Sequence, residues 1–446
     1  MRKRTRFIYN TALLTASTLV MRCIGCAFQV WLAGRIGASG IGLYQLMGSV
    51  GGLAVTFAVS GIGFGTMRLV SEELGRNNPR SAGSAVLCCI GYALFFGCLG
   101  GLLLYRFAEP IGFLWIEDGR TVLPLRIMAW EMPFIALSAV FSGYFTACGR
   151  VGRSTAAGLA QQLLTVGLTY ALLQTVSHGD IADNCACITL AGTLSEALGC
   201  AVLGILYITD RVTHDRSGAP TEGLTGRLLG ISLPLAVSAY TRSALSTLQH
   251  MLTPSGLRKS GLTAAQALSA YGIVHGMTLT VIYFPTCILY VVAQLLIPDL
   301  TEAQVQGSCK RITAICTKML RLSMIYAALT AALLFLLADA IAVGIYNTPQ
   351  VADYIRIFVP IVPMIYMDII VDGCLKGLGQ QLWSMGINIL ESALSVALTY
   401  FLIPRFGIMG FVWVVYFNEI FNFVLSFGKL RQVMSHCAPN NTNCID

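Results

Sequence analysis

Apolar runs of about 20 residues or more follow one another along almost the whole chain, and they constrain the fold more than any other feature. A run of this length crosses the hydrocarbon core of a bilayer as an α-helix. The runs lack two-residue alternation, which disfavours a membrane barrel. Only 11% of the residues are charged, against roughly 25% in soluble domains. Too few charges remain to cover a water-facing surface, so the sequence predicts an all-α integral membrane protein.

About twelve transmembrane helices are expected. They are placed at residues 7–34, 42–66, 82–105, 122–148, 154–176, 185–208, 228–252, 270–297, 320–346, 355–375, 382–403 and 408–427. Most of the 29 Lys and Arg residues fall in alternate loops. Because positive loops stay inside the cell, this bias predicts a multi-pass plasma membrane protein with both termini cytoplasmic. The same bias explains the net charge of +8 without nucleic acid as a partner.

Sequence features recur in the two halves of the chain. An arginine followed seven residues later by a glutamine occurs in the first and seventh predicted spans, and a Gly-Gly-Ser spacing of six and five residues follows the fourth and tenth. These residues are Arg22 and Gln29, Arg242 and Gln249, Gly143, Gly149 and Ser154, and Gly373, Gly379 and Ser384. We therefore expect two pseudo-symmetric six-helix bundles at 1–210 and 228–431, a cytoplasmic linker at 211–227 and a cytoplasmic tail at 432–446. Such repeats are typical of transporters with a substrate site between the halves.

Two arginines are the leading candidates for substrate binding. Arg22 and Arg242 lie deep in their spans, where a charge usually faces a cavity, a partner or water. A guanidinium group pairs well with phosphate because its planar fork donates two parallel hydrogen bonds. Gln29 and Gln249 lie two turns further along the same faces and are expected to bind phosphate or sugar hydroxyls. The alternative is that each arginine pairs internally, with Glu196 or Glu419.

Three acids within the spans are candidates for coupling to Na⁺ or H⁺: Glu196, Asp368 and Glu419. Internal ion pairs or side chains that extend to the membrane surface are the alternative. No catalytic triad, Walker sequence or HExxH motif is present, and we expect no catalytic residues, no metal site, no cofactor and no enzyme activity. Small residues such as Gly61, Gly63 and Gly65 should instead let helices approach closely.

The chain resembles the stage V sporulation protein B family within the superfamily of multidrug, oligosaccharidyl-lipid and polysaccharide exporters, which includes MATE-like transporters. The resemblance covers essentially the whole chain and is diffuse. The matching pieces are Leu233-Pro234, Thr253-Pro254-x-x-Leu257 with Gly261, Tyr271-Gly272, Pro285, Leu296-Ile297-Pro298, Gly37-x-x-Gly40-x-Gly42-Leu43-Tyr44 and Arg68-Leu69-Val70-Ser71-Glu72-Glu73.

Comparison with two branches of this superfamily narrows the expected class of substrate. The stretch Arg22-Cys23-Ile24-Gly25 is similar to the first arginine motif of the lipid II flippases, but their second arginine would fall at Phe28, so lipid II itself is in doubt. Cation-extruding multidrug antiporters typically carry an acid in the first helix. Residues 7–34 contain no Asp or Glu, which argues against that branch.

The resemblance implies a flippase for a lipid-linked anionic saccharide or a peptidoglycan-type precursor. It would work by alternating access between the cytoplasmic and outer leaflets, for spore cortex or envelope polysaccharide. The expected partners are this amphipathic substrate, membrane lipids and envelope-synthesis enzymes. Two alternatives stay open: a cation-coupled multidrug or metabolite antiporter of the MATE type, and a non-transporting scaffold for envelope synthesis.

Overall fold

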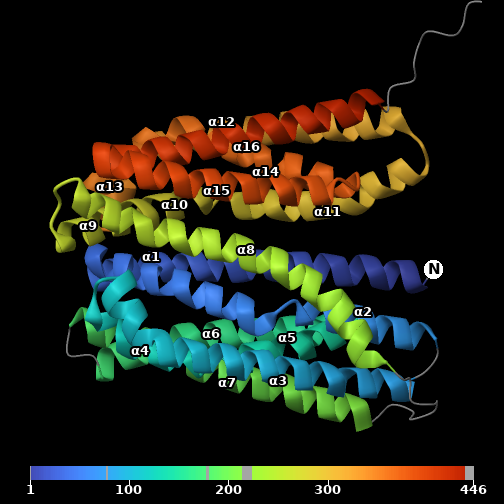
Figure 1. Cartoon of the computed structure of the whole chain (residues 1–446). Helices are drawn as coiled ribbons and strands as arrows, with labels where there is room; N and C mark the ends of the chain where they lie inside the picture. Colours follow the sequence, from blue (N-terminus) through green and yellow to red (C-terminus); the bar gives the residue numbers. More distant parts are fainter. Residues whose placement is uncertain (1, 77–78, 177–179, 213–222, 437–446) are drawn as a thin grey trace, which may run out of the picture. The chain divides into compact units, whose positions relative to one another are not determined.

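The structure is a computed structural model that describes residues 2–76, 79–176, 180–212 and 223–436. In these ranges every regular element is a helix and no strand is present (Figure 1). The all-α expectation is confirmed. Much of the predicted linker and tail lies outside the described residues, so their structure is not considered.

The first part of the chain contains eight α-helices and two short helices of other types (Figure 1). The short elements are a π-helix, η1, and a 3₁₀-helix, η2. In order, the elements are α1 (Arg2–Val59), α2 (Ile62–Gly75), α3 (Pro79–Pro110), η1 (Ile111–Trp115), η2 (Gly119–Thr121), α4 (Val122–Ala129), α5 (Met132–Ala147), α6 (Val151–Thr175), α7 (Ile181–Val212) and α8 (Leu224–Lys259).

The second part also alternates long helices with short ones. Here η3 is a π-helix and η4 a 3₁₀-helix. The elements are α9 (Ala264–Tyr271), η3 (Gly272–Thr278), α10 (Leu279–Tyr283), α11 (Thr286–Val305), α12 (Cys309–Gly344), α13 (Gln350–Phe358), η4 (Val359–Ile361), α14 (Val362–Gly377), α15 (Gln381–Phe406) and α16 (Ile408–His436).

Ten helices of the described residues are long and apolar enough to cross a membrane, or eleven if the bent pair Gly119–Ala129 and Met132–Ala147 forms one span. One of the ten, Ala16–Gly75, contains two of the predicted spans, which are joined at a kink where Gly37 has φ +72°. Glycine adopts this left-handed conformation without steric cost. The span at 270–297 is interrupted between α10 and α11 at Pro285, which lacks an N–H to continue the helix.

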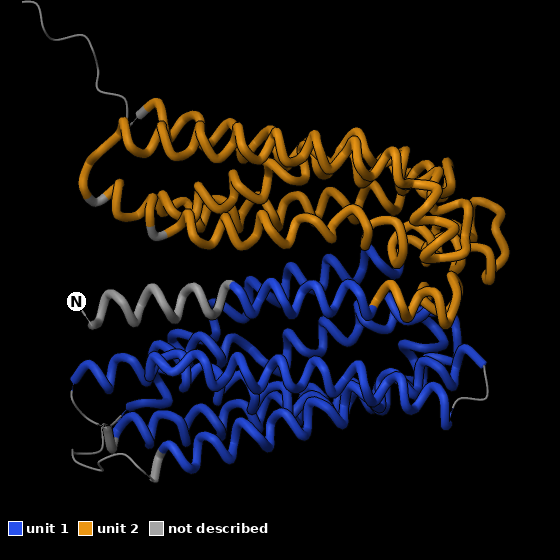
Figure 2. The backbone as a smooth tube through the Cα atoms, turned by 180° about the vertical axis from the view of Figure 1, so that it is seen from behind, with its two compact units in different colours: residues 1–28, 43–251 blue, residues 29–42, 252–446 orange. Residues whose placement is uncertain are grey.

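The chain divides into two compact units (Figure 2). Unit 1 is Met1–Phe28 with Leu43–Met251, and unit 2 is Gln29–Gly42 with Leu252–Asp446. The division falls within α1 and α8, so most of α8 packs in unit 1. The two sequence halves, defined by the repeat rather than by contacts, stay a prediction.

Each unit is built around one central helix. In unit 1, α5 packs against α2, α3 and α7, and in unit 2, α14 packs against α11, α12 and α16. The core of unit 1 includes fully buried Ile62, Leu69, Val86 and Phe145. Large apolar side chains also lie on the outside: Leu336 on α12 is 77% exposed. Such exposure is expected where helices face lipid tails instead of water.

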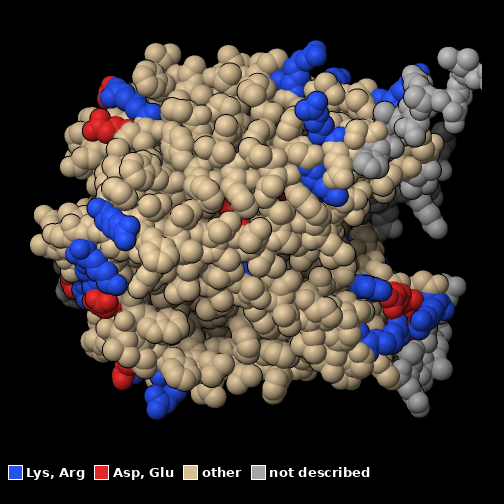
Figure 3. All heavy atoms as spheres, turned by 45° about the horizontal axis from the view of Figure 1, so that its top comes forward, with Lys and Arg blue, Asp and Glu red and all other residues tan. Residues whose placement is uncertain are grey.

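Charged side chains are distributed unevenly along the helices. On the face shown in Figure 3, Lys, Arg, Asp and Glu of each unit gather toward the helix ends, and the stretch between these ends carries few charges. A charge-poor band flanked by charges matches the hydrocarbon core of a bilayer between its polar surfaces. The low charge content of the sequence therefore corresponds to a charge-poor band in the structure.

Candidate transport sites

Both predicted arginines lie in unit 1 and are exposed. Arg22 is on α1, and Arg242 lies near the middle of α8. In the part of the chain that the structure describes, the guanidinium of Arg242 forms no ion pair or hydrogen bond. A charge at this depth needs contact with water or an anion. Within unit 1, Arg242 does not pair with Glu196, and its role in binding an anion stays a prediction.

The two predicted glutamines fall in different units. Gln249 is on α8 in unit 1, seven residues or about two turns beyond Arg242 and on the same helix face. Gln29 belongs to unit 2, where its Nε2 donates a hydrogen bond to Thr280 Oγ1 on α10 at 3.0 Å. The Gln29 amide thus already joins α1 to α10. A role for either glutamine in binding substrate stays a prediction.

Glu196 lies in a small polar cluster inside unit 1. Ser138 Oγ on α5 donates to Glu196 Oε1 at 2.7 Å, and Gln161 Nε2 on α6 donates to Glu196 Oε2. Glu131, at the break between α4 and α5, is close enough to interact electrostatically with Glu196. Two neutral donors thus satisfy the carboxylate where three helices meet.

Asp368 and Glu419, the other two predicted coupling acids, lie together in unit 2. Glu419 on α16 and Glu391 on α15 are close enough to Asp368 on α14 to interact with it electrostatically. Tyr283 donates a hydrogen bond to Glu419 Oε1 at 2.9 Å, and Asn422 Nδ2 donates to Glu391 Oε2 at 2.8 Å. Unit 2 therefore gathers Asp368, Glu391 and Glu419, and Asp368 also interacts with Asp372 and Lys376. In unit 1, Glu196 accepts hydrogen bonds from a serine and a glutamine and lies near one other carboxyl group, that of Glu131.

The Asp368 carboxyl group differs from its neighbours because its Oδ1 is buried and has no hydrogen-bond partner among the described residues. A buried acceptor without a partner is costly. In the described ranges, no three Asp, Glu, His or Cys side chains converge as ligands of one metal ion. A proton on a carboxyl group would lower this cost by removing charge and adding a donor. Coupling to Na⁺ or H⁺ through this cluster stays a prediction.

Sequence reasoning did not single out Glu391, Ser138 or Gln161 as site residues. The repeat contained a signal for all three. Ser138 and Asp368 are 230 residues apart, as are Gln161 and Glu391. The pairs Gly149 with Gly379 and Ser154 with Ser384 have this same offset. Extending the repeat from the glycines to every polar position would have drawn attention to these three residues.

Comparison with known proteins shows what this chain is similar to. The sequence model of the MatE family matches residues 15–171. Stage V sporulation protein B of Bacillus subtilis (strain 168) is 22% identical over 92% of this chain and 80% of its own length. Sporulation protein YkvU of the same bacterium is 20% identical, over 89% of this chain and 88% of its own. An inward-facing multidrug resistance MATE family transporter of the MOP superfamily has a similar fold, with a TM-score of 0.76 at 13% identity, covering 96% of this chain and 99% of that one.

The chain has a MATE-like fold, matches the MatE family model over residues 15–171 and is similar over most of its length to stage V sporulation protein B. The apolar helices of the described residues and the likeness to MATE transporter structures support a multi-pass membrane protein with a transporter fold. The family resemblance seen in the sequence is thereby confirmed.

Several of the motif residues that suggested the family make close helix contacts in this MATE-like protein. In unit 2, a Cβ added to Gly272 would lie 2.0 Å from the Ala38 carbonyl oxygen, and one added to Gly42 would lie 2.4 Å from the Leu268 carbonyl oxygen. In unit 1, a Cβ on Gly65 would lie 2.2 Å from Ser232 Oγ. The expectation that small residues permit close approach is confirmed at Gly61 and Gly65, whereas a Cβ added to Gly63 would make only an ordinary contact at 3.6 Å.

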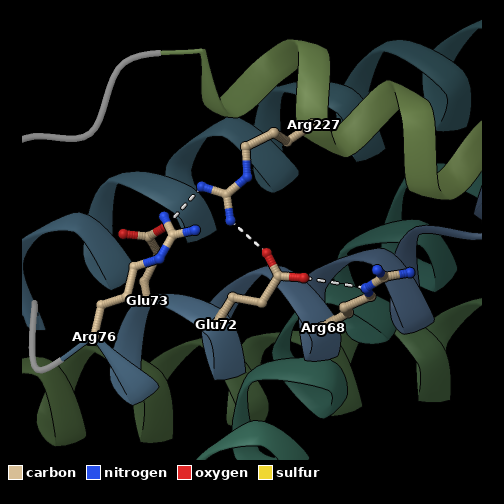
Figure 4. A network of polar contacts seen from close by, with 5 residues as sticks. All are labelled: Arg68, Glu72, Glu73, Arg76 and Arg227. Atoms are coloured by element: carbon tan, nitrogen blue, oxygen red, sulfur yellow. Dashed lines mark hydrogen bonds and ion pairs between the residues drawn. The ribbon is translucent and has the colours of Figure 1, made fainter.

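The Arg68–Glu73 motif forms an ion-pair network that sequence reasoning did not foresee (Figure 4). Arg227, at the start of α8, donates to Glu73 Oε1 at 2.7 Å and to Glu72 Oε2. Arg76 also reaches Glu73 Oε1, at 3.2 Å, and Arg68 reaches Glu72 Oε1, at 3.1 Å. The Glu73 side chain is fully buried. Because a buried carboxylate requires paired charges, this network fixes the start of α8 to α2 within unit 1.

Proposed function

We propose that this protein is a flippase that moves a lipid-linked anionic saccharide, or a peptidoglycan-type precursor, from the cytoplasmic to the outer leaflet by alternating access. Arg242 binds the phosphate of the head group, and Arg22 adds a second positive charge. Gln29 and Gln249 donate hydrogen bonds to phosphate or sugar oxygens. The other expected partners are membrane lipids and envelope-synthesis enzymes.

The observation that carries this proposal is the exposed Arg242 guanidinium in the middle of α8, which has no ion pair in the described part of the chain. A membrane-depth cation without a protein counter-ion favours an anionic cargo. Residues 7–34, which include Arg22, contain no acid that would compete for that charge. Similarity to a sporulation protein over 92% of this chain agrees with a cargo used in building the cell envelope.

The membrane potential gives this direction of transport a driving force. With both termini in the cytoplasm, as the charge bias predicts, the head group leaves a compartment that is negative inside. Each negative charge that crosses gains about 2.3 kcal/mol per 100 mV. Export of a doubly charged pyrophosphate head group therefore needs little or no ion coupling.

The test is head-group accessibility in proteoliposomes that contain a lipid-pyrophosphate saccharide, with and without an inside-negative potential. Wild type should flip the head group faster when the potential is imposed. Arg242→Ala should reduce the rate by about tenfold or more, since one charge-assisted phosphate contact contributes roughly 1.5–3 kcal/mol.

Arg405→Ala, which removes a charge at the end of α15, is the matched control and should flip the head group at the wild-type rate. A folded wild-type protein that does not move this cargo would contradict the flippase proposal. An Arg242→Ala variant with the wild-type rate would remove Arg242 from the binding site.

The carboxyl cluster of unit 2 favours a second candidate, a proton-coupled drug or metabolite antiporter. Asp368, Glu391 and Glu419 lie within electrostatic reach of one another, and Asp368 Oδ1 has no hydrogen-bond partner among the described residues. The MATE structure named above is that of a multidrug resistance transporter. Under this reading, a pH gradient alone drives the efflux of a cationic dye from proteoliposomes, and Asp368→Asn abolishes it. Dye efflux that does not depend on the pH gradient would exclude the antiporter.

A further inference from the structure

Unit 1 contains an apolar groove beside α8, on a different side of the helix from Arg242. Three elements and the short helix η1 form its walls: the later part of α1, the second half of α3, and the middle of α8. Phe57, Leu103, Phe107, Trp115 and Tyr240 are among its lining residues. Its volume is about 440 Å³. None of the candidate transport residues lines it, so it is not the site described above.

The hydroxyl groups in this groove are already hydrogen-bonded within the wall. Tyr240 Oη and Ser60 Oγ lie 2.5 Å apart, and Thr247 Oγ1 donates to the Ser49 carbonyl oxygen at 2.9 Å. Phe57 packs against the Tyr240 ring, with centroids 5.5 Å apart. With these hydroxyls engaged, the groove offers its occupant mainly hydrocarbon and aromatic surface.

All three long helices that line the groove qualify as membrane spans: Ala16–Gly75, Ser81–Trp115 and Leu224–Lys259. The lining offers a polar occupant few free hydrogen-bond partners, so a polar ligand would lose hydrogen bonds to water without replacement. An apolar chain loses nothing on entering the groove. The occupant that fits this chemistry is therefore a lipid hydrocarbon chain.

The spacing of the residues on α8 indicates which lipid would supply this hydrocarbon chain. Tyr240, Ala244 and Thr247 face the groove at spacings of four and three residues, which is one face of a helix. Arg242 and Gln249 are seven residues apart and lie on the opposite face. Arg242 lies between Tyr240 and Ala244 in the sequence, so it is within about 3 Å of each along the helix axis. One level of α8 thus presents an apolar chain site on one side and a cation on the other.

We propose that this groove holds the hydrocarbon tail of the lipid-linked substrate while its anionic head group binds at Arg242. The inference rests on the proposed flippase function and adds to it a place for the tail. A substrate with both a long apolar chain and a phosphate would engage both faces of α8. Filling the groove should then impair a long-tailed substrate and spare one whose tail is too short to reach it.

The experiment combines labelling and transport. A lipid-pyrophosphate saccharide with a photoreactive group near the end of its tail is incorporated into proteoliposomes, irradiated, and mapped by peptide mass spectrometry. Wild type should be labelled within residues 50–57 and 100–111. Ala244→Trp and Ala54→Trp, which fill the groove, should reduce this label and the flipping of the long-tailed substrate by about tenfold. Both variants should flip a short-tailed analogue at the wild-type rate.

Ala332→Trp, at an exposed position of α12, is the matched control and should leave labelling and flipping unchanged. Label spread evenly over lipid-facing helices would mean bulk lipid contact only and would overturn the inference. The inference would also be overturned if both groove variants flipped the long-tailed substrate at the wild-type rate. In that case the flippase proposal would still stand. Localised label with no flipping by wild type would support the groove and refute the flippase.

Discussion

The two units share ion pairs near one end but differ in the polar residues of their interiors. At one end of each unit an arginine pairs with a carboxylate at 2.5 Å and lies over an aromatic ring: Arg126 with Glu109 and Tyr105 in unit 1, and Arg356 with Asp339 and Phe335 in unit 2. All three pairs of positions are 230 residues apart. The contacts of the two central helices, α5 and α14, are likewise equivalent.

Inside the units, positions that are 230 residues apart carry unlike residues. Ser138 and Gln161 surround the carboxylate of Glu196 in unit 1, whereas Asp368 and Glu391 lie near Glu419 in unit 2. The repeat has therefore kept the contacts that position its helices and changed the charge of its interior. We infer that Asp368, whose Oδ1 has no hydrogen-bond partner among the described residues, responds to protons more readily than Glu196, whose oxygens accept from Ser138 and Gln161.

The largest expected effect tests this difference directly. Asp368→Asn should abolish any dependence of transport on an imposed pH gradient, because it removes the unpaired proton acceptor of unit 2. Glu196→Gln should preserve that dependence, since its carboxylate is already satisfied by neutral donors. The measurement is substrate flux in proteoliposomes with and without the gradient. Equal losses in the two variants would mean that the units do not differ in their response to protons.

A smaller effect is expected where helices cross at glycine. Gly272→Ala in unit 2 should destabilise the protein by about 3 kcal/mol, because the new Cβ would overlap the Ala38 carbonyl oxygen. Gly386→Ala, at a position on α15 with no atom within 4 Å of the added Cβ, serves as the control and should be neutral or slightly stabilising. Thermal unfolding of both variants in detergent provides the comparison. Similar midpoints would show that the crossing can open at little cost.

The buried network of unit 1 should matter more than an exposed ion pair of unit 2. Arg227→Ala should cost about 2 kcal/mol, because it removes charge-assisted hydrogen bonds from buried Glu73. Arg311→Ala should cost less than about 1 kcal/mol, since Arg311 and Glu302 are exposed and 3.6 Å apart. Denaturant titration of the two variants measures the difference. The comparison fails if Arg311→Ala is the more damaging substitution.

The smallest effect concerns the contact that both units retain. Double-mutant cycles on Glu109 with Arg126 and on Asp339 with Arg356 should each give a coupling energy below about 1 kcal/mol, because all four side chains are substantially exposed. The two couplings should be similar, and both should weaken as salt is added. A strong coupling in one unit alone would show that these ion pairs have diverged between the units, as the interior residues have.

The sequence alone determined the class of the protein. Apolar runs without alternation require helices in a membrane, because backbone groups must be hydrogen-bonded within the span. The repeat and the diffuse motifs indicated the family. The glycines were also correctly read as sites of close packing, since a small residue in a span has few other roles.

Tertiary structure decided which side chains meet. Gln29 is distant in sequence from Thr280, and Arg227 is distant from Glu73, yet each pair is hydrogen-bonded. The sequence placed Glu196, Asp368 and Glu419 in one class, but their neighbours differ. Ser138 and Gln161 satisfy Glu196, whereas Glu391 lies near the other two acids. A helical pattern fixes which residues share a face of one helix. It does not fix which other helix that face will meet, because that depends on how the helices pack together.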